Sequence, residues 1–230
     1  MDHFHHIYSH RAADYHHMIA PEDTDGNLLK ALTAVTDLRG QRILDLGTGT
    51  GRLPLLLARG ARQFIGLDLY RAMLEENATR RREANGNWGL VHGDMRVLPF
   101  PTASANVVTA GWAIGHLRDW YADDWPGQIG RVLREMHRVV APGGALIILE
   151  TLTTGHLTSA PPTPGLAEYY TWLEGEWSFQ RQAIQTDYQF ASIDEAVART
   201  EFFFGAELAE KIRANGWTRL PEWTGVWSKS

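Results

Sequence analysis

The stretch Ile43-Leu44-Asp45-Leu46-Gly47-Thr48-Gly49-Thr50-Gly51 decides the fold of this chain. A short apolar run that contains one acid breaks into a turn with a glycine at every second position. Apolar runs bounded by turns are typical of buried strands, and glycines allow the backbone of a turn to approach a ligand closely. The stretch therefore predicts a strand over 42–46 that runs directly into a ligand-binding turn.

Strands and helices alternate around this stretch through the first 150 residues. We expect strands over 42–46, 63–68, 88–92, 105–110 and 145–150, and helices over 27–38, 52–59, 70–85 and 130–140. Pro142-Gly143-Gly144 predicts a tight stop between the last of these helices and the fifth strand. The alternation predicts an α/β fold with a doubly wound, mostly parallel sheet, in which ligands bind beyond the carboxyl ends of the strands.

The pattern loosens after residue 151. A long loop that leads to an aromatic-rich segment is of the kind that often forms a lid. Beyond it we expect a strand over 181–190, helices over 192–203 and 205–215, and a last strand over 223–228; Ser192 and Glu195 have the spacing of a capping box. We expect a single domain over 1–230, with an N-terminal cap over 1–26, a ligand-binding core over 27–151, and a substrate-side lid with the last strands over 152–230.

Composition excludes several classes of function. The 230 residues include no cysteine, which rules out disulfides, Cys-ligated zinc and thiol nucleophiles. The net charge of −5, with a single basic run at Arg80-Arg81-Arg82, argues against nucleic acid as a partner. We find no long apolar run and no signal peptide pattern, so we expect no membrane span and a cytoplasmic location.

Two acids follow the second and third expected strands. Asp68 ends the second strand, where a carboxylate can accept hydrogen bonds from both hydroxyls of a ribose, and Asp94 follows the third, where it can bind an adenine amine. Capping of a helix or turn would explain either residue alone. In combination with the glycine turn they favour an adenosine ligand. The dinucleotide fingerprint fits less well, because Gly51 comes one residue too early for its third glycine.

These motifs resemble those of the class I S-adenosylmethionine-dependent methyltransferases. The resemblance spans residues 27–151 and rests on four segments in order: Leu44 to Gly51, Gly66-Leu67-Asp68, Gly93-Asp94-Met95 and Val139-Val140-Ala141-Pro142-Gly143-Gly144. It implies a Rossmann-like sheet of seven strands with the last one antiparallel. It also implies S-adenosyl-L-methionine as the cofactor and S-adenosyl-L-homocysteine as the product.

The resemblance assigns cofactor contacts residue by residue. It implies that the methionine part meets Asp45 and the turn formed by Gly47, Thr48, Gly49 and Gly51. Asp68 would bind the ribose hydroxyls, with Leu69 beside the adenine that Asp94 and Met95 hold. The residues after the fourth strand would pass close to the sulfonium: Ala110, Gly111 and Trp112.

Methyl transfer from a sulfonium is an in-line displacement, for which the protein need not supply a nucleophile. Aromatic faces of Trp112, Tyr8 or Tyr15 can bind the sulfonium by cation–π contact, although apolar packing would explain them equally well. His116 is the candidate general base, because it follows the fourth strand and imidazole titrates near neutrality. A surface or helix-capping position is the alternative for His116.

The expected acceptor is a small molecule, methylated on O, N or C. Its candidate contacts are Tyr8, His116, Glu150, Trp172 and Trp177. We expect no metal, because the histidines of the N-terminal segment and the acids at 119–124 lack the pattern of a metal site. Two other functions stay open: an NAD-dependent oxidoreductase, and a non-catalytic module that binds S-adenosylmethionine and regulates a partner. The sequence does not predict the oligomeric state.

Overall fold

The computed structural model describes residues 3–230, so the first two residues of the expected N-terminal cap lie outside it. Its main sheet has seven strands in the order β3-β2-β1-β4-β5-β9-β6. The strands are β1 (Arg42–Leu46), β2 (Gln63–Asp68), β3 (Gly89–His92), β4 (Ala105–Gly111), β5 (Val140–Thr154), β6 (Gln180–Gln185) and β9 (Glu222–Lys229). Strands β1 to β5 pair in parallel, and β9 is antiparallel to both β5 and β6. The expected sheet, with its last strand antiparallel, is confirmed.

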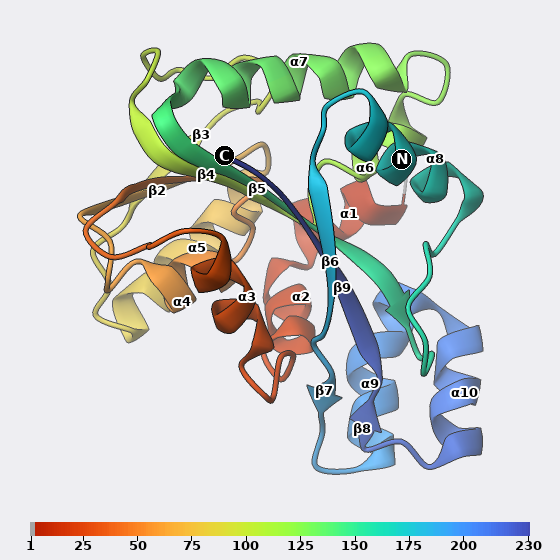
Figure 1. Cartoon of the computed structure of the whole chain (residues 1–230). Coiled ribbons are helices and arrows are strands. Elements are labelled where there is room, and N and C mark those ends of the chain that lie inside the picture. Colours follow the sequence, from red (N-terminus) through yellow and green to blue (C-terminus); the bar gives the residue numbers. More distant parts are fainter. Residues whose placement is uncertain (1–2) are drawn as a thin grey trace.

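Helices cover both faces of this sheet (Figure 1). They are α1 (His3–His10), α2 (Ala12–Ile19), α3 (Asn27–Val35), α4 (Arg52–Leu57), α5 (Arg71–Glu83), α6 (His116–Trp120), α7 (Trp125–Val139), α8 (Pro164–Gly175), α9 (Ile193–Phe204) and α10 (Ala206–Asn215). Side chains alternate along β1: Leu44 and Leu46 pack in one buried cluster with α7 and α8, whereas Ile43 packs in another with α3 and α4. Among the helices of residues 3–230, none combines the length and hydropathy needed to cross a membrane.

A smaller lobe lies beside the start of β9, at the lower right of Figure 1. Strands β7 (Tyr188–Gln189) and β8 (Arg219–Leu220) pair antiparallel there, and α9 and α10 pack with them around a separate apolar cluster. The capping box at the start of α9 is confirmed. The Ser192 hydroxyl accepts from the Glu195 N–H at 3.1 Å, and the Glu195 carboxylate accepts from the Ala191 N–H at 2.6 Å.

The region around Pro142-Gly143-Gly144 differs from the prediction. These residues do not separate the helix from the strand, because β5 already begins at Val140. Its register with β4 shifts, since Ala105 pairs with Val140 but Val107 pairs with Ala145. Pro142, Gly143 and Gly144 therefore form an irregular part of β5, where its pairing with β4 shifts. Helix α7 also begins earlier than expected, at Trp125, with a proline in its first turn where no N–H is needed.

The segments on either side of the core hold more helix than predicted. The N-terminal cap forms α1 and α2, and the expected loop after residue 151 contains the end of β5 and then α8. Thr163 caps α8 by accepting from the Leu166 N–H at 3.1 Å. The expected strand over 181–190 is split at 186–187, so that β6 joins the main sheet and β7 the smaller one.

Candidate active site

Three cavities lie beside the carboxyl ends of β1, β2 and β4. The largest has a volume of about 670 Å³, which is in the range of small-molecule sites, and the other two measure about 100 and 30 Å³. Below they are called the large, middle and small cavities. Tyr15 and Trp112 line all three. The three cavities therefore adjoin at these two aromatic side chains.

The glycine turn forms the floor between the small and middle cavities. Gly47 and Gly49 line both, with φ angles of 67° and 52° that other residues rarely adopt. A Cβ on Gly47 would lie 2.4 Å from the Cβ of Ala113, so the turn packs directly on the segment after β4. Thr48 lines the small cavity, and its buried hydroxyl has no hydrogen-bond partner among residues 3–230. Gly51 lies behind the turn, where it caps α4.

Asp45 lines the small cavity from within the sheet. It is 1% exposed, and the Thr109 hydroxyl donates to its carboxylate at 2.6 Å. Burial raises the pKa of Asp45 to about 7. A carboxyl with this pKa changes protonation near neutral pH, beside the turn.

Asp68 holds the glycine turn to the end of β2. Its carboxylate accepts from the Gly49 N–H and the Tyr70 N–H, each at 2.8 Å, and the residue is 6% exposed. Burial raises the pKa of Asp68 to about 6, even though both backbone hydrogen bonds favour the ionised form. The Asp68 carboxylate thus lines the middle cavity, and its ionisation there lowers the free energy of unfolding.

This cost predicts a specific pH dependence of stability. Folded Asp68 keeps its proton up to about pH 6, whereas in the unfolded chain it loses the proton near its ordinary pKa of 3.8. The folded state therefore binds more protons in this window, and the Asp68 contribution to the free energy of unfolding falls as the pH rises. Relative to wild type, Asp68→Asn should gain about 2 kcal/mol between pH 4 and 6, measured by urea unfolding. A difference that stays flat across this interval would contradict the assignment.

Leu69, Asp94 and Met95 also line the middle cavity. The carboxylate of Asp94 is bound by Arg96, whose side chain donates at 2.6 Å and whose backbone N–H donates at 2.8 Å. Leu69 is 44% exposed and lies at the rim. Asp94, the acid expected to bind an adenine amine, therefore lines the cavity, and its carboxylate is already paired with the Arg96 guanidinium.

Trp112 stands at the junction in a strained conformation. Its φ of 51° is unusual for a bulky residue, and its N–H donates to the Leu149 carbonyl at 2.7 Å. The Arg52 guanidinium lies 3.8 Å from the centre of its ring. Gly111 lines the middle and small cavities, whereas Ala110 is fully buried in the core and lines none of the three.

His116 and Tyr8 join the N-terminal cap to the segment after β4. The Tyr8 hydroxyl lies 2.8 Å from His116 Nε2, and both residues line the large and middle cavities. The His116 ring also stacks on Trp120, with 5.0 Å between ring centres. His116 is the first residue of α6, a short helix that the sequence did not predict. These contacts bring the candidate base to the junction.

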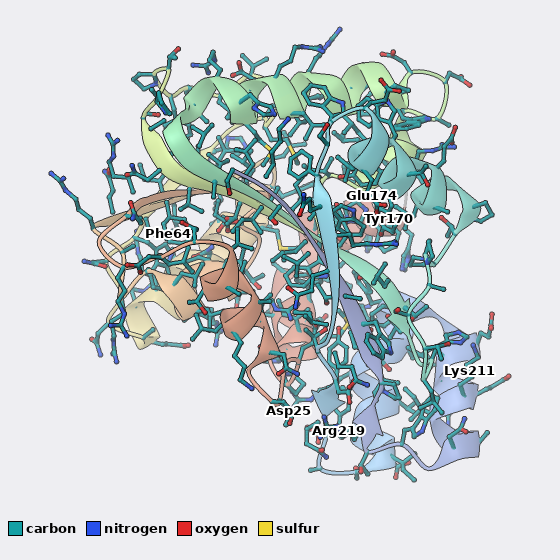
Figure 2. All side chains as sticks on the ribbon, viewed as in Figure 1. Asp25, Phe64, Tyr170, Glu174, Lys211 and Arg219 are labelled. Carbon is teal, nitrogen blue, oxygen red and sulfur yellow. The ribbon has the colours of Figure 1, made fainter. Side chains whose placement is uncertain are left out.

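Glu150 lines the large cavity from the middle of β5. It is 5% exposed, and its carboxylate accepts from the Gly115 N–H at 2.8 Å. Burial raises the pKa of Glu150 to about 8. Tyr170, labelled in Figure 2, lines the same cavity and donates its hydroxyl to the Thr151 carbonyl at 2.7 Å.

Two expected acceptor contacts lie elsewhere. Trp172 and Trp177 line none of the three cavities. Trp172 packs edge-on against Trp125 of α7 with 5.2 Å between ring centres, and Trp177 stacks on His137 at 5.8 Å. Because α8 is a packed helix instead of an open loop, Trp172 belongs to the contact between α7 and α8, and Trp177, which follows α8, packs on α7.

Sequence reasoning missed several residues that line the cavities. Arg52 lines the large and small cavities, and its position directly after the glycine turn could have indicated this. Glu22, Glu222 and Tyr188 line the large cavity, but nothing in their local sequence marks them. Within residues 3–230 no group of three or more His, Asp or Glu side chains is arranged to hold a metal ion.

The sheet order, the glycine turn after β1 and the acids that follow β2 and β3 define a class I methyltransferase fold. A family model described as "Methyltransferase domain" matches residues 44–148. Among solved structures, a SAM-dependent methyltransferase from Aquifex aeolicus superimposes with a TM-score of 0.57 at 14% identity, covering 91% of this chain and 90% of that one. The YcgJ protein from Bacillus subtilis gives 0.55 at 18% identity, covering 87% and 95%.

Curated relatives agree with this class. The chain is 31% identical over 183 residues to a demethylmenaquinone methyltransferase of Geobacillus kaustophilus, covering 77% of this chain and 71% of that protein. It is 32% identical over 144 residues to a malonyl-[acyl-carrier protein] O-methyltransferase of Legionella pneumophila, covering 61% of this chain and 46% of that protein. The chain belongs to the class I S-adenosylmethionine-dependent methyltransferases, and its cofactor is S-adenosylmethionine.

Proposed function

We propose that the enzyme transfers the methyl group of S-adenosylmethionine to a small molecule bound in the large cavity, on O, N or C. The observation that carries this proposal is the junction of three cavities at Tyr15 and Trp112. The small cavity suits a methionine end and the middle cavity suits an adenosine. A sulfonium between them would face the large cavity, as in-line displacement requires.

The residues of the small and middle cavities fit this cofactor. The hydroxyl of Thr48 lacks a partner within residues 3–230, and a Cβ on Gly49 would enter open space, so both leave room for a ligand beside the turn. The Asp68 carboxylate can accept hydrogen bonds from ribose hydroxyls, while Leu69 and Met95 supply apolar contacts for an adenine. Asp94 can accept from the adenine amine only if it shares its carboxylate with Arg96.

Three aromatic side chains would surround the reacting centre. Tyr8, Tyr15 and Trp112 line more than one cavity each, and their ring faces can stabilise positive charge by cation–π interaction. The bound cofactor supplies an electrophilic methyl group, and the chain supplies alignment and exclusion of water. We propose that the α1–α2 segment acts as a cap over this centre, because it contributes both tyrosines.

For an acceptor that must lose a proton, we propose that His116 is the base. Burial raises the pKa of Tyr8, so its hydroxyl stays protonated and can donate to His116 Nε2. A proton leaving the acceptor would pass to the Tyr8 oxygen while the Tyr8 proton moves to His116. Glu150, in the wall of the same cavity, would hydrogen-bond the acceptor.

A small-molecule acceptor is supported by the shape and charge of the site. Aromatic and polar side chains line the large cavity, and the net charge of −5 does not favour a nucleic acid. One relative is named for demethylmenaquinone and another for malonyl-[acyl-carrier protein], so relatives of this chain are named for different acceptors. The acceptor of this chain is thus set by its own cavity walls.

Calorimetric titration tests the cofactor half of the proposal. S-adenosylhomocysteine should bind with a stoichiometry of about one, whereas NAD should give no heat of binding. Tight binding of NAD together with no binding of S-adenosylhomocysteine would support an oxidoreductase and contradict the proposal.

An acceptor panel tests the catalytic half. Candidate hydroxyl, amine and carbon acceptors are incubated with S-adenosylmethionine, and the products are examined for the mass gain of one methyl group. We expect turnover of at least one class of small molecule. Inactivity on every class, together with a stable complex with another protein, would favour the regulatory module instead.

A further inference from the structure

Three charged side chains, two of them almost fully buried, line the large cavity and take no part in the chemistry proposed above. Glu22 follows α2, Arg52 begins α4 and Glu222 begins β9, so the fold brings together three distant parts of the chain. Arg52 Nη1 donates to Glu22 Oε2 at 2.8 Å, and the Glu22 side chain is only 3% exposed. Glu222 is 2% exposed. We call these three residues the acidic cluster.

Each member of the acidic cluster keeps a buried polar atom without a hydrogen-bond partner among residues 3–230. These atoms are Oε1 of Glu22, Nη2 of Arg52 and Oε2 of Glu222. Buried polar groups are almost always hydrogen-bonded, and an unpaired charged group is costly to bury. Because all three residues line the cavity, a ligand in that cavity can supply the missing partners.

The charges of the cluster do not balance. Arg52 faces two carboxylates, since its charge acts on both Glu22 and Glu222. Burial, followed by repulsion from Glu22, raises the pKa of Glu222 well above its ordinary value.

Neighbouring basic groups are engaged elsewhere. Arg219 pairs with Asp187 at 2.8 Å and with Asp25 at 2.5 Å, and Figure 2 shows Asp25 and Arg219 together near β7 and β8. Lys211 lies 3.1 Å from a ring nitrogen of His156. The two carboxyl groups of the acidic cluster therefore share a single guanidinium, and a cationic ligand would favour the ionised form of both.

We propose that the acceptor carries a protonated amine, which binds between Glu22 and Glu222. This inference rests on the proposed function, because it takes the large cavity as the acceptor site. An ammonium group has three donors, enough for both free carboxylate oxygens, and its charge neutralises the cluster. A protonated nitrogen has no lone pair to attack a methyl group. The amine is therefore a binding handle, and the methyl goes to another atom of the same molecule.

Three probes that share one aromatic body test the charge preference. Tyramine is a cation, 4-ethylphenol is neutral and 3-(4-hydroxyphenyl)propionate is an anion, and each is titrated by calorimetry with and without S-adenosylhomocysteine. Tyramine should bind at least about 10-fold more tightly than 4-ethylphenol, as expected for a charged hydrogen bond, and the anion should bind most weakly. Equal binding of all three, tighter binding of the anion, or no binding of tyramine would overturn the proposal.

Substitutions of Glu222 test whether this residue causes the preference for the cationic probe. Glu222→Gln removes the charge but leaves the Arg52–Glu22 pair, and it should weaken tyramine binding by about 10- to 100-fold without affecting 4-ethylphenol. Glu222→Asp keeps a carboxylate and should retain the preference for the cation. Glu210→Gln, an exposed change on α10 outside the cavity, is the control and should bind tyramine like wild type. Tyramine affinity that is unchanged in Glu222→Gln would contradict the assignment.

Proton release gives a second readout, which does not depend on turnover. Burial raises the pKa of Glu222, and an ammonium beside its carboxylate would lower that pKa again. Titrations in two buffers of different ionisation enthalpy should therefore detect release of protons, up to about one for each tyramine bound, in wild type but not in Glu222→Gln. S-adenosylhomocysteine binding without tyramine binding would refute the amine handle alone. If the wild-type protein does not bind S-adenosylhomocysteine, the proposed function is refuted instead.

Discussion

Gly49→Val is expected to abolish measurable binding of S-adenosylhomocysteine while the protein still folds. A Cβ at this position meets only the Gly47 carbonyl oxygen, at 4.0 Å, so a larger side chain extends into open space. Since Gly49 lines both the middle and small cavities, that space is where we propose that the cofactor binds. Filling it should weaken binding by about 100-fold or more, equivalent to roughly 3 kcal/mol of steric conflict.

Gly40→Val is the matched control for this substitution. Gly40 has a similar left-handed φ of 69°, no neighbour within 4 Å of its Cβ, and no part in any of the three cavities. Both variants carry the backbone strain of a branched residue at positive φ, about 1–2 kcal/mol, so their melting temperatures should fall alike. Only Gly49→Val should lose the ligand in calorimetry. If it binds like Gly40→Val, the turn is not the cofactor cradle.

The residues proposed to hold the cofactor could be identified from sequence because they follow strands directly. In a parallel sheet, consecutive strands end at one edge, so Asp45, Asp68 and Asp94 are brought together by the topology alone. The glycine pattern then sets the backbone geometry of the turn. Local sequence was sufficient, since each of these residues lies within two positions of a strand end or inside the strand.

The acceptor half could not be predicted in this way. Its walls come from α1, α2, β5, β7, α9 and the start of β9, which meet only after the chain has folded. Glu22 and Glu222 are two hundred positions apart and neither belongs to a local motif. The number of aromatic residues in a segment did not show which of them line the cavity. Trp172 lies on a helix and packs against Trp125 in the core, whereas Tyr170, two residues earlier, lines the large cavity.

Three buried carboxyls with raised pKa values share one location. Asp45, Asp68 and Glu150 each line a cavity, and burial raises their pKa values to about 7, 6 and 8. Each costs folding free energy at neutral pH, since the folded state disfavours the ionised form. Strongly shifted groups that gather in a cleft are typical of functional sites. The folding free energy that these carboxyls cost is thus concentrated at the cavities proposed to bind the cofactor and the acceptor.

His116→Gln is expected to lower kcat by about 100- to 10,000-fold on an acceptor that must lose a proton. Glutamine keeps a polar side chain near Tyr8 but cannot take up the proton. Because the imidazole lies 2.8 Å from the Tyr8 hydroxyl, Tyr8→Phe should also lower kcat by interrupting the transfer. The rate is measured as the mass gain of one methyl group on the acceptor identified by the panel.

The pattern across variants distinguishes proton transfer from a structural role. His6→Gln changes an exposed histidine on α1, the same helix that carries Tyr8, and it should retain the wild-type kcat. All three variants should bind S-adenosylhomocysteine, since none removes a contact to the glycine turn or to Asp68. An acceptor that carries no removable proton should be methylated by His116→Gln at the wild-type rate. If His116→Gln loses kcat equally on both kinds of acceptor, the imidazole positions the α1 cap and does not act as a base.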